Sequence, residues 1–104
     1  MGLAEEVARF ADEIRQGVGD IKTEITVLPS GAVLLRTRVV GRVFDLDYYP
    51  SLDLFGVDEL EADMGFNTGH KFNFKDFKSA KSKLQSLLKD AQDSVGSQRA
   101  NNQQ

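Results

Sequence analysis

Residues 21–49, with the sequence IKTEITVLPSGAVLLRTRVVGRVFDLDYY, decide the fold of this chain. Apolar and polar residues alternate in three segments of this stretch, which is the period of a half-buried β-strand. Two turn sequences separate the segments, Pro29-Ser30-Gly31 and Gly41-Arg42. Proline favours the backbone geometry of a turn, and glycine accepts a positive φ angle. The stretch therefore predicts a three-stranded antiparallel meander.

The positions of the two turns predict the register of the meander, because the residues that flank a turn must face each other. One set of facing residues is apolar, and we expect it to line the core. Its predicted pairs are Ile21 with Val39, Ile25 with Leu35 and Val27 with Val33 in the first hairpin, and Val39 with Phe44, Thr37 with Leu46 and Leu35 with Tyr48 in the second.

The opposite face of the predicted meander pairs charges. Glu24, Arg36 and Asp47 line up across the three strands. A second row beside them holds Lys22, Arg38 and Asp45. Each arginine then has a carboxylate neighbour, whereas a slip of one residue would place it against an apolar side chain. We therefore expect Asp45 and Asp47 to have structural rather than catalytic roles.

Helical patterns flank the meander on both sides. Leu3, Val7, Phe10, Ile14 and Val18 form one apolar stripe, followed by Gly17 and Gly19. After the meander, alternation around residues 59–66 predicts a fourth strand, and Lys71-Phe72-Asn73 a short fifth one. Asn73 is the expected N-cap of a second helix, with Asp76 three residues on, and this helix should fade near Val95-Gly96. Its predicted buried face consists of Phe77, Ala80, Leu84, Leu87, Leu88 and Ala91.

These elements predict a two-layer α+β domain of order α-β-β-β-β-α. It has an antiparallel meander sheet of three to five strands, with the N- and C-terminal helices packed on one face. The domain should span residues 1–96, because a chain of 104 residues supports a single core. Residues 97–104 are polar and without pattern, which predicts a disordered tail.

Composition narrows the class of protein. The chain has no cysteine, which removes disulfides, thiolate catalysis and cysteine-based metal sites. No stretch approaches the ~20 apolar residues of a membrane span, and the acidic start Met1 to Glu6 is unlike a signal peptide. We therefore expect a cytoplasmic protein that does not contact membranes.

Charge is distributed unevenly along the chain. From Val43 to Gly69 there are seven acidic residues and no lysine or arginine, and six lysines follow between Lys71 and Lys89. The first segment predicts a surface for a basic protein partner, with Asp58, Glu59, Glu61 and Asp63 as its residues on the outer side of a strand. These acids lack the spacing of a calcium loop, so we expect no metal site and no cofactor.

The lysines suggest an alternative. Lys75, Lys78 and Lys89 fall on one flank of the second predicted helix, and Lys71 precedes it, so they would form an anion-binding surface for nucleic acid. The sequence pI of about 5.1 and the lack of interleaved aromatic residues argue against this reading. We therefore do not expect a nucleic-acid partner.

Catalytic motifs are lacking. His70 is the only histidine, and no nucleophile elbow, phosphate-binding loop or second histidine accompanies it. We therefore expect the chain not to be an enzyme and name no catalytic residue. A small hydrolase or ligand-binding protein that uses residues 58–70, with a ligand at the loop 65–70, remains the alternative from another class.

One end of the outer sheet face is predicted to be apolar. Near the first turn the charged rows give way to Leu28, Leu34 and Tyr49, together with Ala32. Either this patch is a contact surface, or Leu52, Leu54 and Phe55 fold back over it. The leading hypothesis is a small non-enzymatic protein-binding module, of the kind of immunity, inhibitor or chaperone proteins, that uses this face and the acidic segment. Its expected partner is a basic protein, and a second copy of the chain is a further candidate.

Overall fold

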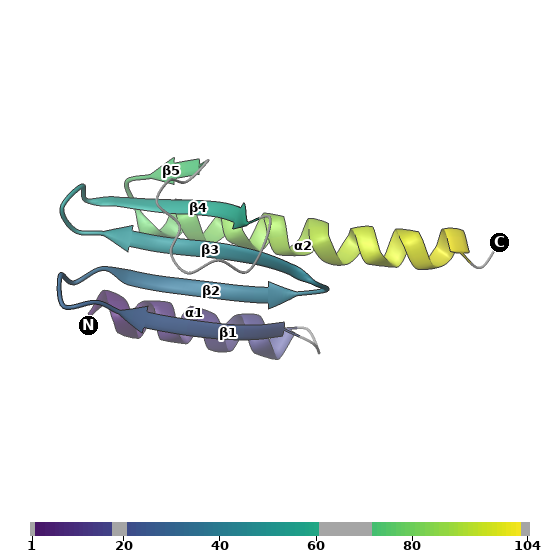
Figure 1. The fold of residues 1–104 in the computed structure, drawn as a ribbon, viewed down its shortest axis with the longest axis horizontal. Coiled ribbons are helices and arrows are strands. Elements are labelled where there is room, and N and C mark those ends of the chain that lie inside the picture. Colours follow the sequence, from purple (N-terminus) through teal and green to yellow (C-terminus); the bar gives the residue numbers. More distant parts are fainter. Residues whose placement is uncertain (1, 18–20, 61–71, 103–104) are drawn as a thin grey trace.

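The computed structural model describes residues 2–17, 21–60 and 72–102 and confirms the predicted α+β architecture. The elements are α1 (Leu3–Gly17), β1 (Ile21–Val27), β2 (Val33–Val39), β3 (Arg42–Tyr49), β4 (Leu54–Leu60), β5 (Phe72–Phe74) and α2 (Phe77–Asn102). The five strands are antiparallel and follow the order β1-β2-β3-β4-β5. Both helices lie on one face of this sheet, as Figure 1 shows. We call that face the inner face and the opposite one the outer face.

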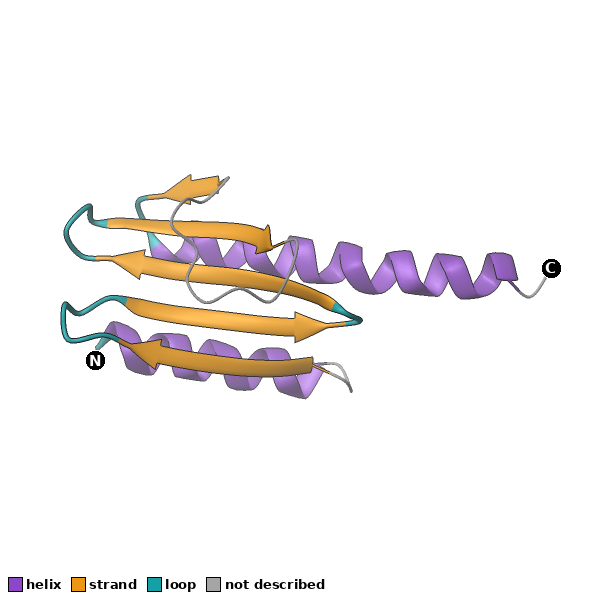
Figure 2. Ribbon diagram, viewed as in Figure 1, coloured by secondary structure: helices purple, strands orange, loops and turns teal. Residues whose placement is uncertain are grey.

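The core lies between the inner face and the two helices. α1 packs on β1 and β2, whereas α2 packs mainly on β3, β4 and β5. Phe10 of α1 meets Phe77 of α2 edge to face, with ring centroids 6.1 Å apart, which joins the two helices above the sheet. The strands contribute Leu35, Phe44 and other buried residues of the inner face. Figure 2 shows the resulting two layers, one of strands and one of helices.

The first hairpin has the predicted register. Ile21 faces Val39, Ile25 faces Leu35, and Val27 faces Val33. The amide of Gly31 donates to the carbonyl of Leu28, and the Leu28 amide donates to the carbonyl of Ala32, both at 2.9 Å. Gly31 has a φ of 94°. This is a three-residue loop closed by a glycine in the left-handed region, as the turn sequence predicts.

The predicted register of the second hairpin is wrong by two residues. Its turn is Val40-Gly41, not Gly41-Arg42, and both residues have positive φ, 47° and 77°. Two positive φ angles define the type I′ turn that best fits strand twist, although valine is a rare choice there. The observed pairs are Val39 with Arg42, Thr37 with Phe44, Leu35 with Leu46 and Val33 with Tyr48. A shift of two residues leaves every side chain on its predicted face.

The C-terminal half differs from the prediction in its boundaries. β4 covers residues 54–60, so it begins before the strand predicted around residues 59–66 and includes Leu54 and Phe55. The predicted continuation through residues 61–66 lies outside the described residues. The expected fifth strand exists as β5. Asp76 caps α2 instead of Asn73, because its carboxylate accepts the amide hydrogen of Ser79 at 2.9 Å.

α2 is longer than the sequence predicts. It runs to Asn102, beyond Val95-Gly96, because one glycine costs a helix only about 1 kcal/mol. The domain boundary at residue 96 stays a prediction. Within residues 2–17, 21–60 and 72–102, none of the helices has the length and apolarity that a bilayer span requires.

Candidate functional site

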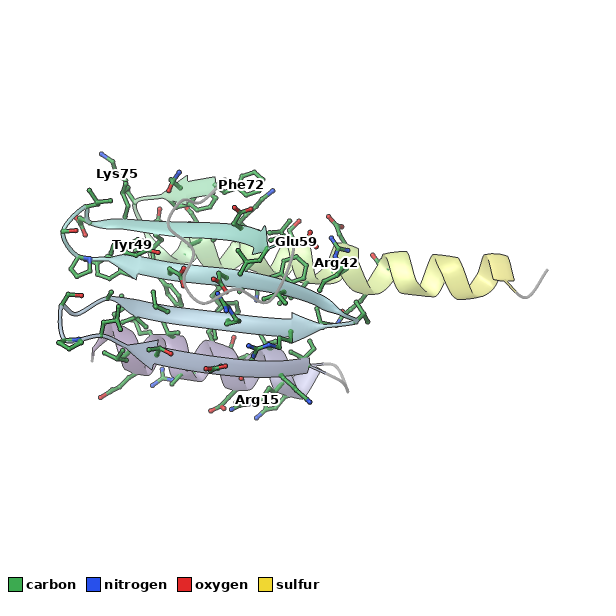
Figure 3. All side chains as sticks on the ribbon, in the orientation of Figure 1. Arg15, Arg42, Tyr49, Glu59, Phe72 and Lys75 are labelled. Carbon is green, nitrogen blue, oxygen red and sulfur yellow. The ribbon has the colours of Figure 1, made fainter. Side chains whose placement is uncertain are left out.

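Four apolar or aromatic side chains line one end of the outer face, where the β1–β2 and β3–β4 turns lie. Leu54 is the direct cross-strand partner of Tyr49, and Leu34 lies between Thr26 and Asp47 on the two neighbouring strands. Leu28 follows β1 and continues the same face by alternation. We call Leu28, Leu34, Tyr49 and Leu54 the turn-end row. All four side chains are half-buried, and Figure 3 labels Tyr49 near the end of β3.

The hypothesis that residues 52–55 fold back over this surface is wrong. Leu52 lies in the β3–β4 turn with 66% of its surface exposed. Leu54 joins the sheet beside Tyr49 and extends the row to a fourth strand. Phe55 points to the inner face, where its ring packs at a tilt against that of Tyr48, with a centroid distance of 4.7 Å. Ala32, which the sequence also places in this patch, is buried.

The two tyrosine hydroxyls are held by carboxylates. Tyr49 donates to Asp47 at 3.4 Å, and Tyr48 donates to Asp53 at 3.0 Å. Burial, reinforced by the negative charge of Asp47, raises the pKa of Tyr49 to about 12. The hydrogen bond to Asp53 raises the pKa of Tyr48. Both phenols are therefore uncharged at neutral pH, and the turn-end row remains apolar with one polar tip.

Beside the row, the outer face is charged, and the partners differ from the predicted ones. Arg36 lies between Glu24 and Asp45, not Asp47, because of the register of the second hairpin. Its guanidinium donates twice to the Asp45 carboxylate, at 2.8 and 2.9 Å, in a nearly buried pair. Arg38 faces Val43, not Asp45, and pairs with Glu24 at 3.2 Å on the surface. Asp45 therefore pairs with an arginine, although with Arg36 and not with the predicted Arg38.

The predicted acidic surface is divided between the two faces of β4. Asp58 lies on the outer face, half-buried and directly opposite Asp45, and accepts the amide hydrogen of Glu59 at 2.8 Å. The prediction is wrong for Glu59, whose side chain lies on the inner face. Arg42 donates two hydrogen bonds to it, at 2.6 and 2.7 Å, and these lower the pKa of the Glu59 carboxyl. Glu61 and Asp63 lie outside the described residues.

The lysines are accessible but separated along the molecule. Lys75 precedes α2, and Lys78 and Lys89 project from its exposed flank. Lys71 and His70 lie outside the described residues, as does the loop 65–69. Lys81 and Lys83 face other groups, since Lys81 pairs with Glu13 of α1 at 3.3 Å and Lys83 lies 4.0 Å from the ring centroid of Phe72.

Sequence reasoning missed a groove between α1 and α2, next to the start of β1. It has a volume of about 180 Å³ and an apolar floor that includes Phe10, Ile14 and Leu88. Gln92 also lines it, and its amide nitrogen is buried with no hydrogen-bond partner within the described structure. No local pattern predicts this groove, because it depends on how two distant helices sit side by side.

Among the residues that the structure describes, no three histidine or carboxylate side chains come together as ligands. Comparison with known proteins adds no functional information, because no family model, no curated protein and no solved structure matches the chain. Its function must therefore be inferred from its own surfaces.

Proposed function

We propose that this chain is a small, non-enzymatic protein-binding module of the cytoplasm, and that the turn-end row is its docking surface. The observation that carries this proposal is that apolar side chains from several strands gather at one end of the outer face. Leu28, Leu34, Tyr49 and Leu54 come from four adjacent segments of one sheet and lie on the face that neither α1 nor α2 covers.

The form of the row suits protein recognition. Three of its side chains belong to strands, so little conformational entropy is lost when they become ordered in a complex. A tyrosine with a fixed hydroxyl at the centre is typical of the residues that dominate interface energies.

The charges near the row favour a basic partner. Asp53 is exposed in the β3–β4 turn, and Asp58 lies further along β4 on the same face as Leu54. Exposed carboxylates such as that of Asp53 accelerate the approach of a cationic surface, an effect that salt weakens, and the half-buried Asp58 adds to the negative potential. Glu59 contributes less to this steering, because Arg42 neutralises it on the inner side.

Affinity capture tests the proposal. The full chain is used as bait in extract of its source cells, with and without nuclease treatment, and the dissociation constant of the captured protein is then measured by calorimetry. We expect Leu34→Gln and Leu54→Gln each to weaken binding about tenfold or more, since interface anchors contribute 2 kcal/mol or above.

Leu52→Gln is the matched control, because it makes the same chemical change outside the row and should leave binding nearly unchanged. Thermal melts establish that all three variants are folded. Equal binding by the folded Leu34→Gln and Leu54→Gln variants would refute the docking surface. Loss of the captured material after nuclease treatment would favour the lysine surface of α2 and a nucleic-acid partner.

The alternative of a small hydrolase or ligand-binding protein depends on residues 58–70. Only residues 58–60 of this segment are described, and of these Asp58 and Glu59 are held by the contacts given above. No observation favours that alternative over protein binding, so it stays a hypothesis.

A further inference from the structure

The edge of the sheet formed by β1 presents an ordered row of backbone hydrogen-bonding groups. β1 has seven residues and pairs only with β2 among the described strands. In an antiparallel pair, alternate residues point their amide and carbonyl groups at the neighbouring strand. The bond from the Leu28 amide to the Ala32 carbonyl shows that the even-numbered residues of β1 are the ones directed at β2.

The second hairpin gives the same result independently. A two-residue turn at Val40-Gly41 makes Val39 and Arg42 a hydrogen-bonded pair, so the odd-numbered residues of β2 are directed at β3. The even-numbered residues of β2 are then directed at β1. The backbone groups of Ile21, Thr23, Ile25 and Val27 must therefore point away from β2, to the free edge.

Few symmetric pairings are compatible with this edge. Two β1 strands related by a twofold axis can form hydrogen bonds only if outward-pointing residues face outward-pointing residues. Such a pairing keeps both inner faces on the same side. The residue that lies on the twofold axis, opposite its own copy, is the centre of the pairing, and it can be Lys22, Thr23, Glu24 or Ile25.

Side-chain chemistry selects one of these centres. A pairing centred on Lys22 or on Glu24 would place two like charges directly opposite each other. A pairing centred on Ile25 is also unfavourable, because it leaves the charged Lys22 opposite the apolar Leu28. With Thr23 at the centre, Lys22 of each copy lies opposite Glu24 of the other on the outer face, and Ile21 lies opposite Ile25 on the inner face. Every facing pair of residues 21–25 is then complementary.

The adjacent flank of α1 is compatible with this arrangement. Arg15 donates a hydrogen bond to the Thr23 hydroxyl at 2.8 Å, so its flank of α1 lies over β1, and Figure 3 shows Arg15 near that edge. Helical spacing places Ala4 and Ala8 on the same flank. Small side chains there allow the helices of two copies to approach across the twofold axis.

We propose that the protein forms a homodimer in which β1 pairs antiparallel with β1 of a second copy, centred on Thr23. Two five-stranded sheets then become one continuous sheet, with all helices on one side. The free edge strand is thereby paired, which is one way in which proteins protect such edges from unspecific association. The dimer uses a surface other than the turn-end row, so it does not depend on the proposed function.

Light scattering after size exclusion tests the dimer through its mass, which should be twice the 11.5 kDa of one chain at high concentration. The charge pair supplies the decisive variants. Lys22→Glu should weaken the dimer about tenfold or more, because glutamates then face each other twice. Adding Glu24→Lys restores opposite charges in both pairs and should recover most of the affinity.

Thr23→Pro is a second, backbone-based variant. It removes an amide that points to the partner rather than to β2, and proline is tolerated in that position of an edge strand. We expect a folded monomer. Hydrogen exchange of the unmodified protein supplies a readout without mutation, because the amides of Ile21, Thr23 and Ile25 should become protected as concentration rises.

The outcomes separate clearly. A wild-type mass of one chain at millimolar concentration would overturn the proposal. So would a dimer that Thr23→Pro leaves intact, or a double charge exchange that is no more dimeric than Lys22→Glu alone. Thermal melts of each variant distinguish loss of the dimer from loss of the fold.

Discussion

Removing the positive charge of Arg36 should destabilise the domain far more than the same change at Arg38. The side chains of Arg36 and Asp45 are only 14% and 4% exposed, and two hydrogen bonds join them. Breaking a buried ion pair by removing one partner costs about 3–5 kcal/mol. Because Arg36 retains some contact with solvent, we expect Arg36→Met to lower the free energy of unfolding by about 2–4 kcal/mol.

Arg38→Met is the matched control. Arg38 lies two residues away on the same face, and its pair with Glu24 has side-chain exposures of 33% and 61%. Exposed pairs contribute about 0–1 kcal/mol, so the control should lose no more than that. Urea denaturation followed by circular dichroism measures both variants.

A double-mutant cycle with Asp45→Asn isolates the interaction between the two side chains. We expect a coupling energy of more than about 1 kcal/mol between positions 36 and 45. The same cycle between positions 36 and 47, the pairing that the sequence alone predicts, should give a smaller value. Equal losses in the two methionine variants, or a larger coupling to Asp47, would contradict the observed register.

Three further predictions concern turns, caps and ionisation. Val40→Asn should stabilise the domain by about 1 kcal/mol, because asparagine tolerates the left-handed conformation that strains valine. Gly41→Ala should destabilise the domain by about the same amount. Thermal melts that show no difference between the two variants would refute the turn assignment. Asp76→Ala should lower the melting temperature at neutral pH, because it removes the cap of α2. The Ser79 amide lowers the pKa of Asp76 below its ordinary 3.8, so the stabilisation is complete above that pH. The difference in melting temperature between wild type and variant should therefore shrink as pH falls below 3.8. Tyr49 has its pKa raised from 10.0 to about 12, so the folded state favours the neutral phenol. Its contribution to stability should be constant below pH 10 and be lost as pH rises towards 12. Urea midpoints between pH 10 and 12 should fall less for Tyr49→Phe, and equal declines would show that another group titrates.

The two hairpins show what turn sequences can and cannot predict. The first register followed from Pro29 and Gly31, whose conformational preferences leave one position for the loop. In the second hairpin only Gly41 marks the turn, and it fits either half of a two-residue loop. The correct solution places Val40 at positive φ, which no residue preference indicates. Burial could not decide, because both registers place the same side chains on the inner face.

Parts of the candidate site were predictable, because the face on which a side chain lies does not depend on the choice between the two registers. Leu28, Leu34 and Tyr49 fall on the outer face in either register, so the sequence brought them together correctly. The sequence does not place Leu54 beside them, because the apolar residues from Leu52 to Phe55 fit a covering segment equally well. Glu59 was placed on the wrong face, because its pairing with Arg42 joins residues distant in the chain and depends on two registers at once. Asn73 and Asp76 are equally good N-cap residues by type. Asn73 lies within β5, so the cap of α2 falls to Asp76.

The order of the strands has a consequence for how the chain folds. Each strand of β1-β2-β3-β4-β5 pairs with its neighbour in sequence, α1 packs on the two strands that follow it, and α2 packs mainly on the three that precede it. Short loops close with little loss of entropy, and chains dominated by local contacts fold quickly. The first hairpin can therefore form under α1 while the rest of the chain is still being synthesised, and each later strand adds to an existing edge. α2 closes the remaining core last, so the inner face of β3 and β4 stays open until synthesis is nearly complete.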